Sequence, residues 1–273
     1  MLTVSPVAGK VGAEISGVDL RKLDNDTVDA IRAAWLQHGV VFFRDQDLTG
    51  DEYLAFAHAI GELARYPFLP GIDGYPDIIA VTKLPHETVN FGGIWHSDTA
   101  YLDEPPMATM LLSREIPPFG GDTMFASQYA AYDALSDGMK ELLEPLRGIN
   151  SSAMADVSKT REDRIKEHDG GVPQVFEAAH PVVRTHPETG RKALYVNVAH
   201  TARFDGMTED ESRGLLQFLF AHQTKPEFQC RFRWSVGALA LWDNRCVQHN
   251  PVNDYHGHKR VMHRITLQGD RPF

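Results

Sequence analysis

The stretch FQCRFRWSVGALALW, residues 228–242, contains two patterns typical of β-strands. Between 228 and 234, large apolar residues alternate with polar ones, which is the period expected when one face of a strand is buried. From 238 to 242, ALALW is a short apolar run and a second strand candidate. The last third of the chain is therefore expected to be mainly β-structure.

Elsewhere in the chain, short strand patterns outnumber helix patterns. A helix is predicted at 24–38, where apolar residues recur at helical spacing before Gly39. Two capping boxes, at Thr49–Glu52 and Thr208–Glu211, predict two more helices. Further strand candidates lie at 40–43, 77–81, 107–113, 182–186, 193–197 and 260–267. Many short strands without regular strand-helix alternation favour a mainly β fold with flanking helices, a sandwich or a jelly-roll barrel, over a doubly wound parallel sheet.

The composition is that of a globular protein, since 42% of the 273 residues are hydrophobic and 23% are charged. No repeat, low-complexity tract or linker divides the chain, so we expect a single domain over 1–273. The net charge of −10 argues against a nucleic-acid partner, because such binding depends on clustered Lys and Arg. With two cysteines and no secretion signal or membrane-spanning pattern, we expect a cytoplasmic protein without a membrane partner.

Two histidines and one acid form a candidate metal site. His96 and Asp98 stand two residues apart in IWHSDTAY, so their side chains share one face if this segment is extended. His249 follows the strand candidate ALALW, and two imidazoles with one carboxylate are the ligand set of mononuclear iron(II) oxygenases. The alternative is that His249 is a structural histidine bonded to a backbone carbonyl.

The chain has one other triplet of this type, His186-Pro187-Glu188. With 13 His and 37 acidic residues in 273, chance alone produces about two such triplets. The Pro and Gly of HPETG indicate a surface turn between two strands, which is a poor place for a buried metal. We therefore expect the metal at the first triplet.

The predicted strand RVMHRITL, 260–267, places Arg260 and Arg264 on one face. At about 3.3 Å per residue, their Cα atoms are about 13 Å apart, which suits two anionic ligands side by side. In a chain this acidic, pairing of both arginines with surface Asp or Glu is the alternative.

Four motifs appear together and in order: WHSDTAY at 95–101, GGDT at 120–123, LWDNRCVQH at 241–249 and KRVMHRITLQGD at 259–270. With GAEISGVDL near the start, they make the chain resemble the taurine dioxygenase and phenoxyalkanoate herbicide dioxygenase (TauD/TfdA) family almost end to end. These enzymes depend on iron(II) and 2-oxoglutarate. The resemblance implies a double-stranded β-helix (a cupin-like jelly roll) and an oxidoreductase that uses O2. It also implies a homo-oligomer, a dimer or a tetramer.

The resemblance implies a role for each motif residue. His96, Asp98 and His249 would hold Fe(II), and Thr123 and Arg260 would bind the distal carboxylate of 2-oxoglutarate. Arg264 would face a small anionic substrate, such as a sulfonate, carboxylate, sulfate ester or phosphonate. The expected reaction hydroxylates a substrate carbon while 2-oxoglutarate is converted to succinate and CO2.

Three positions depart from taurine-specific members of the family. Tyr66 replaces a His that contacts the sulfonate, Gly92 replaces an Asn, and His200 replaces a Phe that lines the pocket. Gly92 is expected to leave room for a bulkier substrate group. These changes favour an anion other than taurine, with taurine dioxygenase proper as the alternative.

Two functions of other classes remain open at this stage. A zinc-dependent hydrolase or lyase could use the same three ligands to activate water, and a non-catalytic jelly-roll binding protein could hold the histidines structurally. The polar segment 152–175 is either a lid over the active site or a solvated loop.

Overall fold

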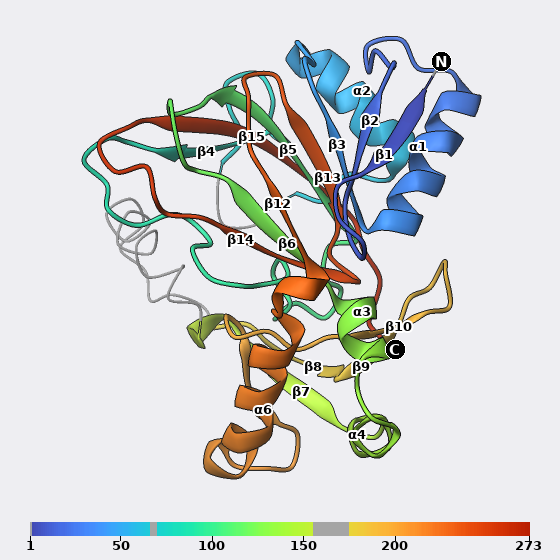
Figure 1. The fold of residues 1–273 in the computed structure, drawn as a ribbon. Helices are drawn as coiled ribbons and strands as arrows, with labels where there is room; N and C mark the ends of the chain where they lie inside the picture. The colour runs from blue at the N-terminus through green and yellow to red at the C-terminus, as the bar shows by residue number, and fades with distance from the viewer. Residues whose placement is uncertain (1, 66–69, 155–174) are drawn as a thin grey trace.

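The computed structural model describes residues 2–65, 70–154 and 175–273. The protein is mainly β, with helices packed on the sheets (Figure 1). Within the described residues, no helix combines the length and the apolar character needed to span a membrane.

A seven-stranded sheet forms the upper part of Figure 1, in the order β1-β2-β3-β13-β5-β15-β4. All neighbouring strands in it are antiparallel except β2 and β3. The strands are β1 (Thr3–Pro6), β2 (Ala13–Ser16), β3 (Val40–Phe43), β13 (Leu239–Asp243), β5 (Ala108–Glu115), β15 (Arg260–Leu267) and β4 (Ile79–Lys83).

Helices α1 (Asn25–His38) and α2 (Gly50–Ile60) cover one face of this sheet. The α1 helix is capped by Asp24 at its start and by Gly39 at its end, where a φ of 73° suits glycine. The α2 helix begins at the predicted capping box of Thr49 and Glu52. Alternate residues of the central strands, such as Val41 and Phe43, point towards the helices and bury a first core.

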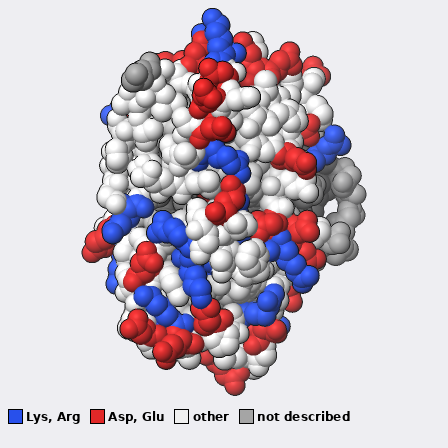
Figure 2. All heavy atoms as spheres, turned by 90° about the vertical axis from the view of Figure 1, so that its right-hand side faces the viewer, with Lys and Arg blue, Asp and Glu red and all other residues white. Residues whose placement is uncertain are grey.

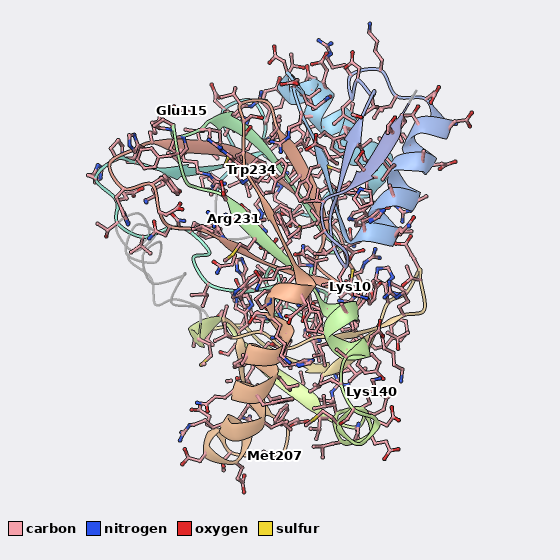
Figure 3. The ribbon with its side chains drawn as sticks, viewed as in Figure 1. Lys10, Glu115, Lys140, Met207, Arg231 and Trp234 are labelled. Atoms are coloured by element: carbon pink, nitrogen blue, oxygen red, sulfur yellow. The ribbon has the colours of Figure 1, made fainter. Side chains whose placement is uncertain are left out.

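The opposite face packs on a small sheet, in the order β12-β6-β14, made of β12 (Gln229–Phe232), β6 (Thr123–Ser127) and β14 (Val247–Pro251). Between the sheets, the rings of Phe42 and Phe232 stack with centroids 4.0 Å apart. Trp234, labelled in Figure 3, lies just beyond β12 in the same core. This layer, between two sheets, also holds the candidate site.

A lower layer completes the fold (Figure 1). Its described part contains a three-stranded sheet, a β-hairpin and three helices around a third core. The elements are β7 (Arg147–Ser151), β8 (Glu177–Pro181), β11 (Thr201–Phe204), the hairpin β9 (Val183–Thr185) and β10 (Lys192–Leu194), α3 (Gln128–Asp133), α4 (Asp137–Leu143) and α6 (Glu209–Gln223), with 3-10 turns η1 (Ser152–Met154) and η2 (Pro226–Phe228).

The predicted strand at 193–197 is shorter in the structure, because β10 ends at Leu194. Asn197 forms a local turn instead: its side chain accepts a hydrogen bond from the His200 N–H, and its own N–H donates to the Thr201 hydroxyl. Asparagine competes in this way with the hydrogen bonds of a strand.

The surface in Figure 2 carries basic and acidic side chains interspersed. A nucleic-acid-binding face would instead group its Lys and Arg. That this protein has no nucleic-acid partner stays a prediction.

Candidate active site

The three predicted metal ligands meet at one place. His96 and Asp98 lie between β4 and β5, and His249 lies in β14. His96 and His249 form an isolated antiparallel bridge in which each N–H donates to the other carbonyl, at 3.1 and 2.9 Å. Residues far apart in the chain are thus held side by side by their own backbones.

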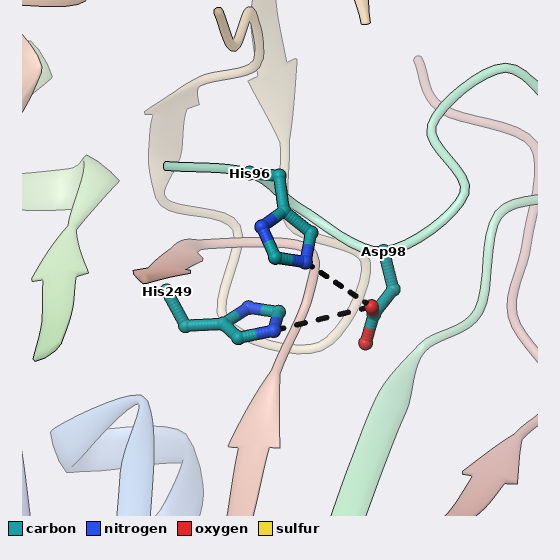
Figure 4. Close-up of side chains that lie close together, drawn as sticks. All are labelled: His96, Asp98 and His249. Atoms are coloured by element: carbon teal, nitrogen blue, oxygen red, sulfur yellow. Dashed lines mark ion pairs between the residues drawn. The ribbon is translucent and has the colours of Figure 1, made fainter. Parts of the chain in front are cut away.

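Figure 4 shows the side chains converging. The Nε2 atoms of His96 and His249 lie 3.7 and 4.0 Å from Oδ1 of Asp98. All three side chains are buried, and their ligand atoms lie within 4.8 Å of one another. His96 Nδ1 donates to the Ile94 carbonyl at 2.7 Å, which leaves the lone pair of Nε2 facing the site.

The charges suit a cation. Burial lowers the pKa of both His96 and His249, so that both imidazoles are neutral near pH 7 and can offer a nitrogen lone pair to a metal ion. Burial alone would raise the pKa of Asp98, but its neighbours, Arg264 first among them, outweigh burial and hold this pKa below its usual value. Two neutral imidazoles and one ionised carboxylate fit a divalent metal ion such as Fe(II).

Arg260 borders the same layer and fits a carboxylate. Its side chain is buried, and its Nε and Nη2, which share one edge of the guanidinium, have no hydrogen-bond partner among the described residues. This edge presents parallel N–H groups that match a carboxylate. Burial lowers the pKa of Arg260, a sign that its charge is poorly solvated.

Thr123 is oriented by a residue that the sequence did not single out for this site. Trp234 Nε1 donates to the Thr123 hydroxyl oxygen at 3.0 Å, so the Thr123 O–H is directed to another acceptor. The Trp234 ring also lies against Arg260, 5.7 Å from its guanidinium. On β4, buried Lys83 pairs in register with Arg260 and adds a second positive charge on the same face.

Residues 3–266 match the model of the taurine catabolism dioxygenase TauD, TfdA family. The chain belongs to this family. It is 36% identical to an α-ketoglutarate-dependent sulfate ester dioxygenase of Pseudomonas putida over 99% of this chain and 91% of that protein.

Solved structures of TauD/TfdA relatives superpose over nearly the whole chain. A taurine dioxygenase from Burkholderia xenovorans is 36% identical, with a TM-score of 0.83, over 99% of this chain and 92% of that one. AAD-2, solved in complex with Mn(II) and N-oxalylglycine, is 29% identical, with a TM-score of 0.82, over 100% of this chain and 99% of that one. The resemblance inferred from the motifs is therefore confirmed.

Arg264, the predicted substrate ligand, is also tied to the metal site. Its Nη2 lies 3.1 Å from Oδ2 of Asp98, and both side chains are buried. That Arg264 faces the substrate stays a prediction, and the contact adds that its loss would also disturb a metal ligand.

The three positions that differ from taurine-specific members of the TauD/TfdA family have different surroundings. His200 is buried, with its ring centroid 6.2 Å from that of His96. Gly92 has a φ of 74°, and a Cβ there would lie 2.8 Å from Cε1 of His96. A side chain at position 92 would therefore meet His96, and the expectation that Gly92 leaves room for a bulkier substrate group stays a prediction. Tyr66 lies outside the described residues, as does 155–174 of the segment considered as a lid.

The second triplet begins the surface turn that we expected, which joins β9 to β10 and exposes Pro187, Glu188 and Gly190. His186 itself is buried, however, at 1% exposed, and its Nε2 donates to Asp243 Oδ2 at 3.0 Å. His186 Nδ1 accepts the N–H groups of Glu188 and Thr189, so both ring nitrogens are used. Asp243 is further neutralised by Arg245. His186, Asp243 and the neighbouring Cys246 thus form a structural polar cluster, because its ligand atoms are already engaged.

Proposed function

We propose that this protein is an Fe(II)- and 2-oxoglutarate-dependent dioxygenase that hydroxylates a carbon of a small anionic organic substrate. The observation that carries the proposal is the convergence of His96, Asp98 and His249 at one buried point. When bound, Fe(II) and 2-oxoglutarate supply the oxidation of a C–H bond by O2, coupled to loss of CO2 and formation of succinate.

In this proposal the protein residues mainly bind and orient. His96, Asp98 and His249 hold the metal, Arg260 binds the distal carboxylate of 2-oxoglutarate through its unpaired edge, and Thr123 donates its O–H to the same group. Burial of these groups excludes water and strengthens each contact.

The substrate class follows from Arg264 and from the relatives. An arginine beside the metal site favours a sulfonate, carboxylate, sulfate ester or phosphonate, and the relatives include an enzyme named for sulfate esters. His200 lies next to His96 on the proposed substrate side, and Tyr66 and Gly92 complete the set of substrate positions that we propose. Taurine is the second candidate.

The same proposal covers the architecture. The seven-stranded sheet and the small sheet are taken as the two halves of a double-stranded β-helix within a single domain, 1–273.

The two cysteines of the protein are buried and unpaired, which favours the reducing cytoplasm. A homo-oligomer is proposed from the family alone.

The test is anaerobic titration of the apoprotein with Fe(II) and 2-oxoglutarate while recording the weak visible charge-transfer band of the complex. A panel of an alkyl sulfate, taurine, an alkylphosphonate and a phenoxyacetate is then added, and succinate is measured after O2 is admitted. We expect a band that one class of anion perturbs, and the same anion should raise succinate formation.

His96→Ala and His249→Ala should lose the band, whereas His58→Ala, in the exposed part of α2, should keep it. Absence of the band in the wild-type protein, or substrate turnover without O2 and 2-oxoglutarate, would refute the proposal and favour a zinc-dependent hydrolase or lyase.

A further inference from the structure

The two carboxylate oxygens of Asp98 have different surroundings. Oδ1 faces the Nε2 atoms of both histidines, at 3.7 and 4.0 Å. Oδ2 points the other way, where the Thr109 hydroxyl lies at 2.6 Å and Arg264 Nη2 at 3.1 Å. One oxygen is thus available to a metal, and the other is held by the protein.

A chain of hydrogen bonds leads to that second oxygen, and its direction is fixed. Trp242 Nε1, which can only donate, lies 3.0 Å from Oδ1 of Asn244. The Asn244 amide nitrogen must then be the group that donates to the Thr109 hydroxyl oxygen, at 3.1 Å. Because that oxygen already accepts a proton from Asn244, the single O–H of Thr109 is directed to Asp98.

Asn244 also ties down the backbone around Asp98. Its side-chain oxygen lies 3.4 Å from the Asp98 N–H, and its backbone carbonyl accepts a hydrogen bond from Ser97 Oγ at 2.6 Å. Thr109, Trp242 and Asn244 are 2% exposed or less, so water does not compete for these bonds. Fully paired buried networks of this kind are rigid.

We propose that Thr109 and Asn244 are positioning residues that hold Asp98 so that only Oδ1 binds the metal. The inference rests on the proposed function, in which Asp98 is a metal ligand. A carboxylate bound through both oxygens would take up a metal position that 2-oxoglutarate or O2 needs. Thr109 and Asn244 thus keep the metal open to its cosubstrates without touching it.

The decisive variant is Thr109→Val, which keeps the shape of the side chain and removes the hydroxyl. Partners that orient metal ligands typically contribute about 10- to 100-fold to metal affinity. We expect the Kd for Fe(II), measured anaerobically, to rise within that range, and the charge-transfer band with 2-oxoglutarate to shift at saturating metal. Thr109→Ser should restore both, because it returns the O–H.

Asn244→Leu should raise the Kd for Fe(II) in the same way. In the double variant with Thr109→Val, the two effects on the free energy of Fe(II) binding should add to less than their sum, because both residues act through Oδ2 of Asp98. The matched control is Thr266→Val. Thr266 pairs directly with Thr109 across β15 and β5 and is also buried, but its hydroxyl has no partner among the described residues. This control should bind metal like the wild type.

A wild-type Kd and an unshifted band in Thr109→Val would overturn the proposal, as would an equal effect in Thr266→Val. If Thr109→Val does not fold, Thr109→Ala in the same titration decides between these outcomes. The proposed function fails on results from the wild-type protein, which are an absent band or turnover without O2 and 2-oxoglutarate, so the two failures are distinguishable.

Discussion

Replacement of Arg260 by Met tests how the protein distinguishes 2-oxoglutarate from other 2-oxo acids. Met is similar in length and apolar, so it can pack against Trp234, but it removes the guanidinium edge formed by Nε and Nη2. We expect a large loss of 2-oxoglutarate affinity with little change in metal binding, because Arg260 is not among the side chains that hold His96, Asp98 or His249.

The size of the loss follows from the two donors on that edge. A hydrogen bond to a charged group contributes about 1.5 to 3 kcal/mol, so two of them contribute about 3 to 6 kcal/mol. Since about 1.4 kcal/mol corresponds to a tenfold change, affinity should fall by about 10²- to 10⁴-fold. Arg260→Lys, which keeps the charge but loses the fork, should fall between the wild type and Arg260→Met.

The assay compares two ligands by the charge-transfer band in anaerobic titrations with Fe(II). One is 2-oxoglutarate; the other is 2-oxopentanoate, which has the same chain length and no distal carboxylate. Arg260→Met should weaken the first strongly and leave the second within about threefold, which isolates the carboxylate contact as in a double-mutant cycle. Equal weakening of both ligands, or of neither, would refute the assignment of Arg260.

Three further predictions concern the surroundings of the site. Gly92→Ala should weaken Fe(II) binding by about tenfold or more in a metal titration, because its Cβ would meet the His96 ring at 2.8 Å and a φ of 74° strains alanine; unchanged binding would contradict this. Arg264→Met should weaken both substrate and Fe(II) binding, since Arg264 contacts Asp98, and loss of substrate affinity alone would argue against that link. Burial lowers the pKa of His180 from 6.5 to about 4, so the folded protein resists its protonation. Below pH 6.5 its contribution to stability is progressively lost, by about 3 kcal/mol in total at pH 4; urea unfolding of His180→Gln should show a weaker fall between pH 7 and 4 than the wild type.

Much of this fold was accessible from local patterns. The capping boxes at Thr49 and Thr208 begin α2 and α6, and the alternation from 228 to 234 coincides with β12 and its buried face. These patterns depend on neighbours in sequence, so a single chain carries them. The pairing of His96 with His249, by contrast, could be proposed only from ligand chemistry and the family motifs.

The residues that escaped prediction act through contacts distant in sequence. Thr109 lies inside an ordinary strand pattern, and Asn244 lies in a turn after ALALW; neither differs locally from a structural residue. The burial of His186 was missed for a related reason. The turn that follows it is at the surface, as predicted, but the hydrogen bond to Asp243, 57 residues away in sequence, holds the imidazole in the interior. A spacing rule does not include such partners.

The tight turn between β13 and β14 has a consequence for how this protein can change over generations. Asn244 is hydrogen-bonded to Thr109 beside the metal site, whereas Asp243 is hydrogen-bonded to Arg245 and to His186 of the lower layer. A substitution in this turn therefore disturbs both the metal site and the lower layer. His200 belongs to a different segment and is buried next to the metal site, with its ring centroid 6.2 Å from that of His96. In the substrate role that we propose for His200, replacements at this position can change which anion is oxidised while the oxidising centre is inherited intact, and a laboratory library that varies His200 and spares the turn follows the same route.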